Sequence, residues 1–215
     1  MGVESEGDTV RFTRTLASLK REGSNVLVTG DGAGEAHSVA CEELFGERVV
    51  DRRRAVVSTA HGDAGYGHDP DDATRIEYST ATRSTATAAS DVGPVPGVER
   101  DLASLGEAIA DAIAEADRTV GGLAPAQFRL CVDSLGPLLE AHDERSVFRF
   151  LHAVTGDIRA VDGMGHYHLP MAPDADPVRT LEPLFDAVVE LRADSEPQQR
   201  WRLVGKDAET EWLPL

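Results

Sequence analysis

The sequence predicts one α/β domain, residues 1–215, with a mainly parallel central sheet and helices on both of its faces. Three observations support this fold class. Short β-branched runs alternate with segments of helical periodicity, which is the connection that parallel strands need. The length fits a single domain, and the chain contains neither an internal repeat nor a recognisable boundary. The last two strand-like runs have no helix between them, so an antiparallel hairpin is expected at one edge.

The first elements form a strand, a glycine-rich turn and a helix. Residues 1–8 are rich in glycine and acids and are expected to be frayed, and a short leading helix follows up to Gly23. The β-branched run at 26–29 predicts a strand that ends at the glycine-rich turn 30–34. A helix is expected from about residue 35 to residue 45.

The middle of the chain predicts two more strands, two loops and a helix. The strands are expected at 55–59 and, with a weaker pattern, at 75–79. Residues 60–73 are rich in glycine and aspartate, and residues 80–97 in serine, threonine and alanine, so both are predicted to be flexible loops that bury little. Apolar residues at helical spacing predict an amphipathic helix over 98–118.

The rest of the chain continues the alternation of strand and helix. Strands are predicted at 128–132 and 164–169. Between them we expect a helix that Asp143 caps and that extends to Val161. A short helix at 178–184 then precedes the two strands of the expected hairpin. These strands lie at 185–191 and 200–204, joined around residues 193–197.

The charge is strongly acidic, with 38 Asp plus Glu against 21 Lys plus Arg and a formal net charge of −17. Such a chain repels phosphate backbones and anionic lipids, which argues against nucleic-acid and membrane partners. Only Lys20 and Lys206 are lysines, a pattern typical of proteins dissolved in molar salt, where screening is strong. Without an apolar leader or a stretch of about 18 apolar residues, the sequence predicts a cytoplasmic protein.

The order of elements resembles a known superfamily. The strand and turn at 26–34, the strand running into Cys131-Val132-Asp133-Ser134-Leu135 and the late strand from Phe185 together resemble the RecA/KaiC-type ATPase core. The chain looks more narrowly like a haloarchaeal branch of uncharacterised proteins related to that superfamily. This closer resemblance covers about residues 10–205 and rests on the segments 23–28, 147–156 and 163–169.

The phosphate loop that the resemblance implies is degenerate here. A working loop reads G-x-x-x-x-G-K-[ST], but with Gly30 as its first glycine the lysine and hydroxyl positions hold Ala36 and His37. Taking Gly34 as the second glycine places Glu35 and Ala36 there instead. Residues 30–47 contain no Lys or Arg and five acids. Each charge pair with a nucleoside triphosphate would repel by about 4 kcal/mol, more than the helix dipole offsets.

Bound Mg-ATP is therefore disfavoured, and no cofactor is expected. The positions that correspond to a nucleotide site are Gly30, Asp31, Gly32, Gly34, Asp133 and Ser134. We expect Asp31 or Glu35 to satisfy the free N–H groups of the following helix, as phosphate does in active relatives.

The catalytic residues that the resemblance implies are also incomplete. Asp133 matches the acid that ends the magnesium-supporting strand of RecA/KaiC proteins, although an acid at a strand end often only caps the next segment. The paired glutamates that follow the second strand in KaiC relatives have no counterpart before Asp63. His61 lies there instead, and a lone loop histidine is seldom a base.

A second cluster of chemical interest is His166-Tyr167-His168. On a strand, residues i and i+2 point to the same face, so two imidazoles could chelate zinc if a third ligand came close, with His152 and Asp133 as candidates. Structural histidines that bond neighbouring loops are the alternative. Cys41 and Cys131 lie in apolar contexts without C-x-x-C spacing and are interpreted as core thiols.

The sequence leaves three functions open. The first is a non-catalytic, degenerate RecA/KaiC-like domain with a regulatory or signalling role, a protein partner and the option of a homo-oligomer. The second is a weak or unconventional ATPase that uses Asp133, with Arg52–Arg54 or a neighbouring subunit replacing the missing lysine. The third is a small-molecule or metal site at the carboxyl edge of the sheet, built from His61, Asp133, His166 and His168.

Overall fold

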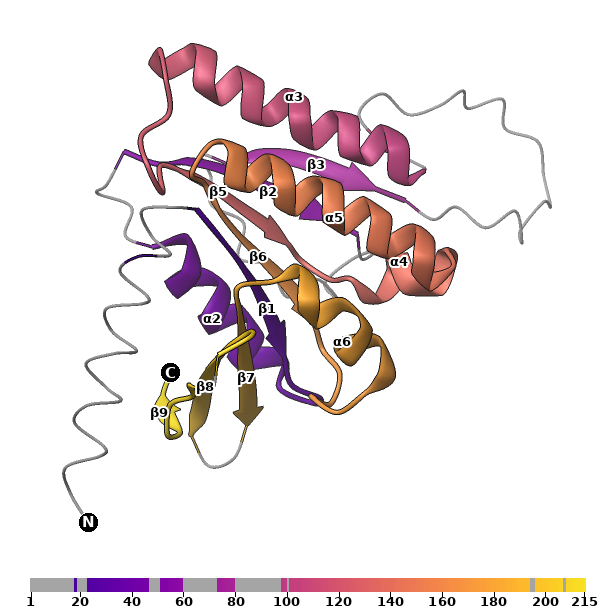
Figure 1. Ribbon diagram of the computed structural model, residues 1–215, viewed down its shortest axis with the longest axis vertical. Helices are drawn as coiled ribbons and strands as arrows, with labels where there is room; N and C mark the ends of the chain where they lie inside the picture. Colours follow the sequence, from indigo (N-terminus) through magenta and orange to yellow (C-terminus); the bar gives the residue numbers. More distant parts are fainter. Residues whose placement is uncertain are drawn as a thin grey trace.

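The computed structural model describes residues 18, 23–46, 51–59, 73–79, 98–99, 101–193, 196–206 and 208–215. Within these residues one sheet of nine strands has the order β4-β3-β2-β5-β6-β1-β7-β8-β9 (Figure 1). The seven strands from β4 to β7 are parallel, and β8 and β9 are antiparallel. The strands are β1 (Ser24–Thr29), β2 (Arg53–Ser58), β3 (Thr74–Tyr78), β4 (Val98–Glu99), β5 (Phe128–Val132), β6 (Met164–Leu169), β7 (Ala187–Ala193), β8 (Pro197–Leu203) and β9 (Leu213–Pro214).

Helices cover both faces of the sheet. The helices are α2 (Gly34–Phe45), α3 (Leu102–Val120), α4 (Gly136–Ala141), α5 (Glu144–Ala160) and α6 (Asp176–Leu181), and a 3₁₀ turn at Glu182–Leu184 follows α6. The large core holds Leu27 of β1 together with the buried side chains of α3, α5 and α6. Val26 and Val28 point to the other face and pack on α2. Successive residues of β1 thus face opposite layers, as the pleat requires.

The sheet register sets which side chains meet. β1 lies between β6 and β7, and β5 lies on the far side of β6. Cys131 of β5 pairs with His166 of β6, and Val28 of β1 pairs with His168. Because these strands are parallel, the turn after β1 and the residues after β5 share one edge of the sheet.

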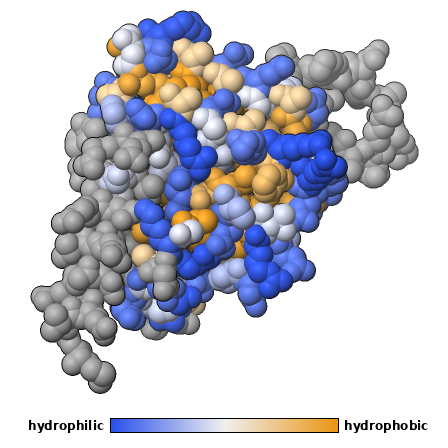
Figure 2. Space-filling view, viewed as in Figure 1, coloured by the Kyte–Doolittle hydropathy of each residue, from blue (hydrophilic) through white to orange (hydrophobic). Residues whose placement is uncertain are grey.

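The face of the molecule that α3 and α5 form carries both hydrophobic and hydrophilic side chains. Hydrophobic residues gather over α3, α5 and α6 and are interrupted by hydrophilic side chains (Figure 2). Among the larger apolar side chains of the described residues, Leu213 of β9 is exposed to solvent. None of the described helices combines the length and hydropathy that crossing a bilayer requires.

The structure confirms the α/β class, the mainly parallel sheet with helices on both faces and the antiparallel C-terminal hairpin. Several boundaries differ. The helix predicted from residue 98 begins at Leu102, because Asp101 caps it and residues 98–99 pair with β3. The short helix α4 and strand β9 were not predicted. Apart from Ser18 and Ala73, the leading helix and the two predicted loops lie outside the described residues.

Candidate functional site

The turn after β1 is closed by contacts within the protein. Gly30 donates its N–H to Met171 O at 3.0 Å, and its own carbonyl lies 3.0 Å from His37 Nε2. A Cβ at Gly30 would lie 2.4 Å from Leu191 O, and φ is +139° there, so this position requires glycine. Asp31 and Gly32 form the exposed tip, and Gly34 begins α2.

The prediction that Asp31 or Glu35 caps α2 is wrong. Ala33 is the N-cap residue, and no side chain among the described residues bonds to the N-terminal amides of this helix. Glu35 lies exposed in the first turn, where its charge favours the helix dipole without a hydrogen bond. The turn places Asp31 too early in the chain to act as the cap.

Asp133 directly follows β5 and is 2% exposed. Its Oδ1 accepts hydrogen bonds from the Thr59 N–H and hydroxyl, both at 2.9 Å, and its Oδ2 accepts one from the Ser58 hydroxyl at 3.0 Å. Burial raises the pKa of the Asp133 carboxyl, although these hydrogen bonds oppose the rise. The Ser134 hydroxyl accepts a bond from Gly136 N at 3.2 Å. The Asp133 side chain therefore joins the end of β5 to the end of β2, and the Ser134 side chain stabilises the start of α4.

These residues do not fit Mg-ATP. One strand, β6, separates β1 from β5, so the turn and Asp133 are on the order of 10 Å apart across the sheet. At one end of this distance, the Gly30 N–H is bonded to Met171 O, and no cationic residue occupies the position of the loop lysine. At the other end, both carboxylate oxygens of Asp133 accept hydrogen bonds. Residues 30–47 supply no lysine or arginine to balance the charge of the phosphates.

The basic run does not replace the missing lysine within this chain. Arg53 begins β2 and therefore lies at the amino edge of the sheet, opposite the turn after β1. A strand of this length spans about 20 Å. Arg52 donates to Phe45 O at 3.1 Å, and Arg129 of β5 donates to Leu44 O at 3.0 Å. These guanidinium groups thus cap the C-terminal carbonyls of α2.

A buried group of cysteines and histidines lies between α2 and the sheet. Their ligand atoms all fall within 4.8 Å of one another. The Cys41 Sγ is 3.4 Å from the Cys131 Sγ and 3.3 Å from His166 Nε2. We call this group the Cys/His cluster; its members are Cys41 of α2, Cys131 of β5, and His166 and His168 of β6.

His37 of α2 fixes which ring nitrogen of His168 faces it as a donor. His37 Nε2 faces the Gly30 carbonyl and must donate to it, so Nδ1 of the neutral ring accepts. His37 Nδ1 lies 2.9 Å from His168 Nδ1, which must therefore carry the proton. Burial, and next the nearby His168 ring, lower the pKa of His37 to about 4, which keeps its ring neutral at neutral pH. His168 then presents a bare Nε2, which has no hydrogen-bond partner among the described residues.

The two thiols have unequal environments. Burial on its own would raise the pKa of Cys41, but a hydrogen bond from Cys131 and the neighbouring His166 ring lower it on balance. Burial raises the pKa of Cys131, and its position beside Cys41 raises it further. Burial also lowers the pKa of His166, so that ring is neutral. Cys41 is therefore the more acidic of the two thiols.

Part of the Cys/His cluster was predicted from the sequence. His166 and His168 do share a face, as their spacing predicts, and both cysteines are buried. The proposed third ligands are wrong: His152 is exposed on α5, which packs on the other face, and Asp133 is bonded to Ser58 and Thr59. The site therefore lies between two layers rather than at the carboxyl edge. His61 lies outside the described residues.

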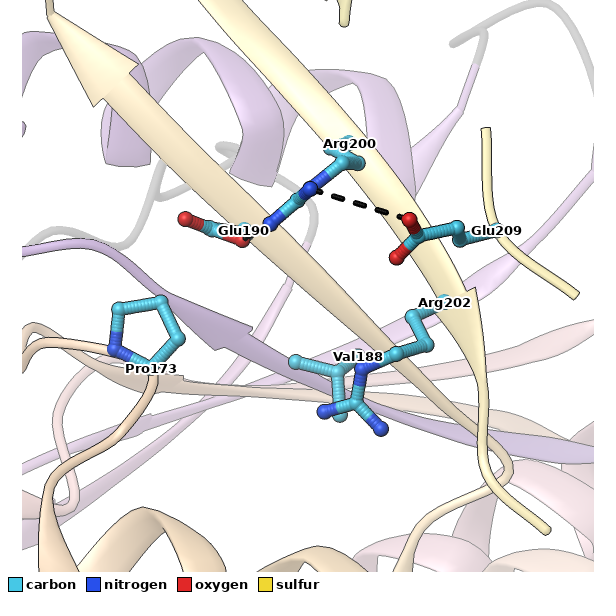
Figure 3. A pocket seen from close by; sticks show the side chains of 6 residues that line it. All are labelled: Pro173, Val188, Glu190, Arg200, Arg202 and Glu209. Carbon is cyan, nitrogen blue, oxygen red and sulfur yellow. Dashed lines mark hydrogen bonds and ion pairs between the residues drawn. The ribbon is translucent and has the colours of Figure 1, made fainter. Parts of the chain in front are cut away.

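A pocket on the C-terminal strands carries charge, but its charges are paired. It is lined by Glu190, Arg200, Arg202 and Glu209 with Val188 and Pro173 (Figure 3). Arg200 contacts Glu190 at 2.6 Å and Glu209 at 3.9 Å. Arg202 forms a two-point pair with Glu182 at 2.6 and 2.7 Å. Arg200 therefore links the two strands of the hairpin, and Arg202 ties β8 to the 3₁₀ turn that precedes β7.

The fold defines an α/β protein with a mainly parallel sheet, a glycine turn after its central strand and a buried Cys/His cluster beneath the following helix. Comparison with protein families matches residues 23–191 to a family of unknown function, DUF7504, and the chain belongs to that family. The matched segment extends from β1 through most of β7 and contains the turn, Asp133 and the Cys/His cluster. A comparison with curated proteins gave no match.

Proposed function

We propose that this chain is a non-catalytic, RecA/KaiC-like domain in which the phosphate loop has become a structural turn. It has a regulatory or signalling role and acts by binding another protein in a high-salt cytoplasm. The observation that carries the proposal is the Gly30 peptide, whose N–H bonds Met171 and whose carbonyl bonds His37. A phosphate loop needs backbone N–H groups that are free to donate to anionic oxygen, and the Gly30 N–H is already used.

Charge supports the same function. Asp31 at the exposed tip and Glu35 in the first helical turn oppose a polyphosphate, and the arginines at 52–54 lie at the other end of α2. The net charge of −17 also disfavours nucleic acid as a partner. The step from fold to regulation is an analogy with the superfamily that the sequence resembles.

Calorimetric titration of the full chain with Mg-ATP and Mg-ADP in molar KCl tests the proposal, with phosphate release measured on the same samples. We expect no saturable heat at millimolar nucleotide and no hydrolysis above background. A dissociation constant below about 100 μM, equivalent to about 5.4 kcal/mol of binding, would overturn the proposal.

A double variant, Asp31→Asn with Glu35→Gln, separates charge from geometry. It removes the repulsion at the turn but leaves the Gly30 N–H bonded to Met171. We expect this variant to remain unable to bind nucleotide. If neutralising the two acids restores saturable binding, the turn has kept the geometry of a phosphate loop, and the claim of a structural turn is wrong.

A further inference from the structure

The Cys/His cluster has the composition and spacing of a metal site. We propose that it binds one structural zinc ion between α2 and the sheet, with Cys41, Cys131, His166 and His168 as the four ligands. The inference goes beyond the proposed function and does not depend on it, because it concerns the buried side of α2 rather than the turn before it.

The distances fit tetrahedral zinc. Zn–S bonds of about 2.3 Å and Zn–N bonds of about 2.0 to 2.1 Å place neighbouring ligand atoms roughly 3.3 to 3.8 Å apart. The Sγ–Sγ distance is 3.4 Å, and the Cys41 Sγ to His166 Nε2 distance is 3.3 Å. The widest separation in the cluster, within 4.8 Å, closes by side-chain rotation of about an ångström.

The chemistry of the donors selects the ion. Two thiolates and two neutral imidazoles bind zinc with no net charge, which suits a site without solvent, and magnesium and calcium prefer oxygen ligands. Cys41, Cys131 and His168 are 0% exposed and His166 is 2% exposed. With four protein ligands and no open position, the ion is structural and not catalytic.

The surroundings of His168 are those of a zinc ligand. Its Nε2 is buried without a hydrogen-bond partner in the described structure, and its Nδ1–H donates to His37. A ligating histidine commonly donates its second nitrogen to a group that fixes the ring. His37 is a positioning residue here, and it extends the contact to the Gly30 carbonyl. The ion would thus fasten α2 and its leading turn to β5 and β6.

The test is zinc binding by the full chain, stripped of metal and kept reduced in molar KCl. We expect one zinc per chain and a dissociation constant below about 1 μM in competition with a chelator. Cobalt in place of zinc is expected to give thiolate charge-transfer bands and the intense visible bands of a tetrahedral site. This readout uses the unaltered chain, so it does not depend on the folding of any variant.

Variants assign the ligands. Cys131→Ala and His168→Ala are each expected to weaken zinc binding by at least about 100-fold, and His37→Phe by about 10- to 100-fold while cobalt remains tetrahedral. His152→Ala is the matched control, since that histidine is exposed on the opposite layer, and it is expected to bind zinc as the unaltered chain does.

Three results would overturn the inference. The first is a zinc dissociation constant above about 1 μM, and the second is a cobalt spectrum without thiolate bands. The third is a disulfide between Cys41 and Cys131 in protein purified with zinc present, since their sulfur atoms lie 3.4 Å apart. None of these results bears on nucleotide binding at the turn, so failure of this inference is distinct from failure of the proposed function.

Discussion

Asn25 is a fully buried polar side chain in β1, the strand that leads into the glycine turn. Its Nδ2 donates to Thr155 O at 3.1 Å, and its Oδ1 accepts from the Tyr167 hydroxyl at 2.9 Å. Its backbone N–H donates to Asp186 Oδ2 at 2.8 Å. One residue therefore joins β1 to α5, β6 and the start of β7, and it fixes the position of the turn.

Replacing Tyr167 with phenylalanine tests this network. Tyr167→Phe removes the donor to Asn25 Oδ1 and leaves a buried acceptor unsatisfied, so we expect a loss of about 1 to 3 kcal/mol in the free energy of unfolding. Urea unfolding in molar KCl measures it. Tyr78→Phe is the control, because that hydroxyl bonds His142 in a partly buried place and its loss is expected to cost less. Equal losses in the two variants would contradict the account.

Glu35 gives a second prediction at this scale. Glu35→Lys puts a cation in the first turn of α2, where the dipole favours an acid, so the fold is expected to lose about 0.3 to 2 kcal/mol. Because Gly30 remains bonded to Met171, the variant is also expected to bind no Mg-ATP. Unfolding and titration of the same protein in the same salt check both. A fully stable variant that binds nucleotide would mean that the turn is a recently disabled phosphate loop.

Residue spacing predicted half of the Cys/His cluster. The two histidines occupy positions i and i+2 of one strand, so their shared face follows from the pleat alone. Cys41 and Cys131 are 90 residues apart, and only the pairing of β5 with β6 and the docking of α2 bring them to the histidines. Local sequence does not encode that juxtaposition, which is why apolar surroundings suggested core thiols.

The helix α2 is held at its two ends by different means. Its N-terminus has an acidic first turn and no side-chain cap, and its last turn contains no basic residue. Arg52 and Arg129 come from outside the helix and donate to the carbonyls of Phe45 and Leu44. Burial, followed by the neighbouring Arg52 and Arg54, lowers the pKa of Arg129 to about 10, so it remains charged at neutral pH.

Removing the Arg129 cap is expected to destabilise the fold. Arg129→Met keeps much of the apolar stem but takes donors from Leu44 O and Ala126 O, which predicts a loss of about 2 kcal/mol. Thermal unfolding of both forms measures it. Arg118→Met is the comparison, because Arg118 forms an exposed pair with Glu115, and its loss is expected to stay within about 0.5 kcal/mol. A neutral Arg129→Met would show that water satisfies the helix end.

Long periodic elements could be predicted from sequence, and short ones could not. Helix α5 has Asp143 as its cap, with the side chain bonded to Ser146 N, and its buried apolar residues recur at helical spacing from Val147 to Ile158. The six-residue helix α4 begins at Gly136-Pro137 and is too short to show a period. Strand β9 has two residues, which pair only because β8 presents an open edge.

The net charge of −17 acts on the molecule as a whole. Ion pairs such as those of Arg200 and Arg202 neutralise acids locally on the hairpin, but 38 acids face only 21 basic residues. Salt shortens the distance over which the excess acids repel one another, from about 10 Å at 0.1 M to about 3 Å at 1 M. The composition indicated this property directly, because charge is a sum and does not depend on the fold.

Stability is therefore expected to fall when KCl is lowered from about 1 M to about 0.1 M, with a clear decrease in the thermal midpoint. Calorimetry or circular dichroism across that range measures the decrease. Sodium chloride and potassium chloride at equal concentration are expected to act alike, since screening depends on ionic strength. A midpoint that does not change with salt would remove the high-salt interpretation.

At the scale of the molecule, the fold class followed from the alternation of strands and helices, whereas the state of the turn did not. The sequence showed which groups are missing from a phosphate loop. It could not show that Met171 and His37 hydrogen-bond to the N–H and the carbonyl of Gly30, because both contacts depend on how β6 and α2 pack. The most direct test of the central claim is therefore the backbone amide NMR spectrum of the turn.

The measurement is a titration of the ¹⁵N-labelled chain with Mg-ATP to millimolar concentration in molar KCl, following the amides of Gly30, Gly32 and Gly34. We expect these signals not to shift, since the Gly30 N–H is already bonded to Met171 and residues 30–47 contain no lysine or arginine. Saturable shifts confined to the turn and to the residues around Asp133 would show that nucleotide binds there, and would contradict the claim that the turn is structural.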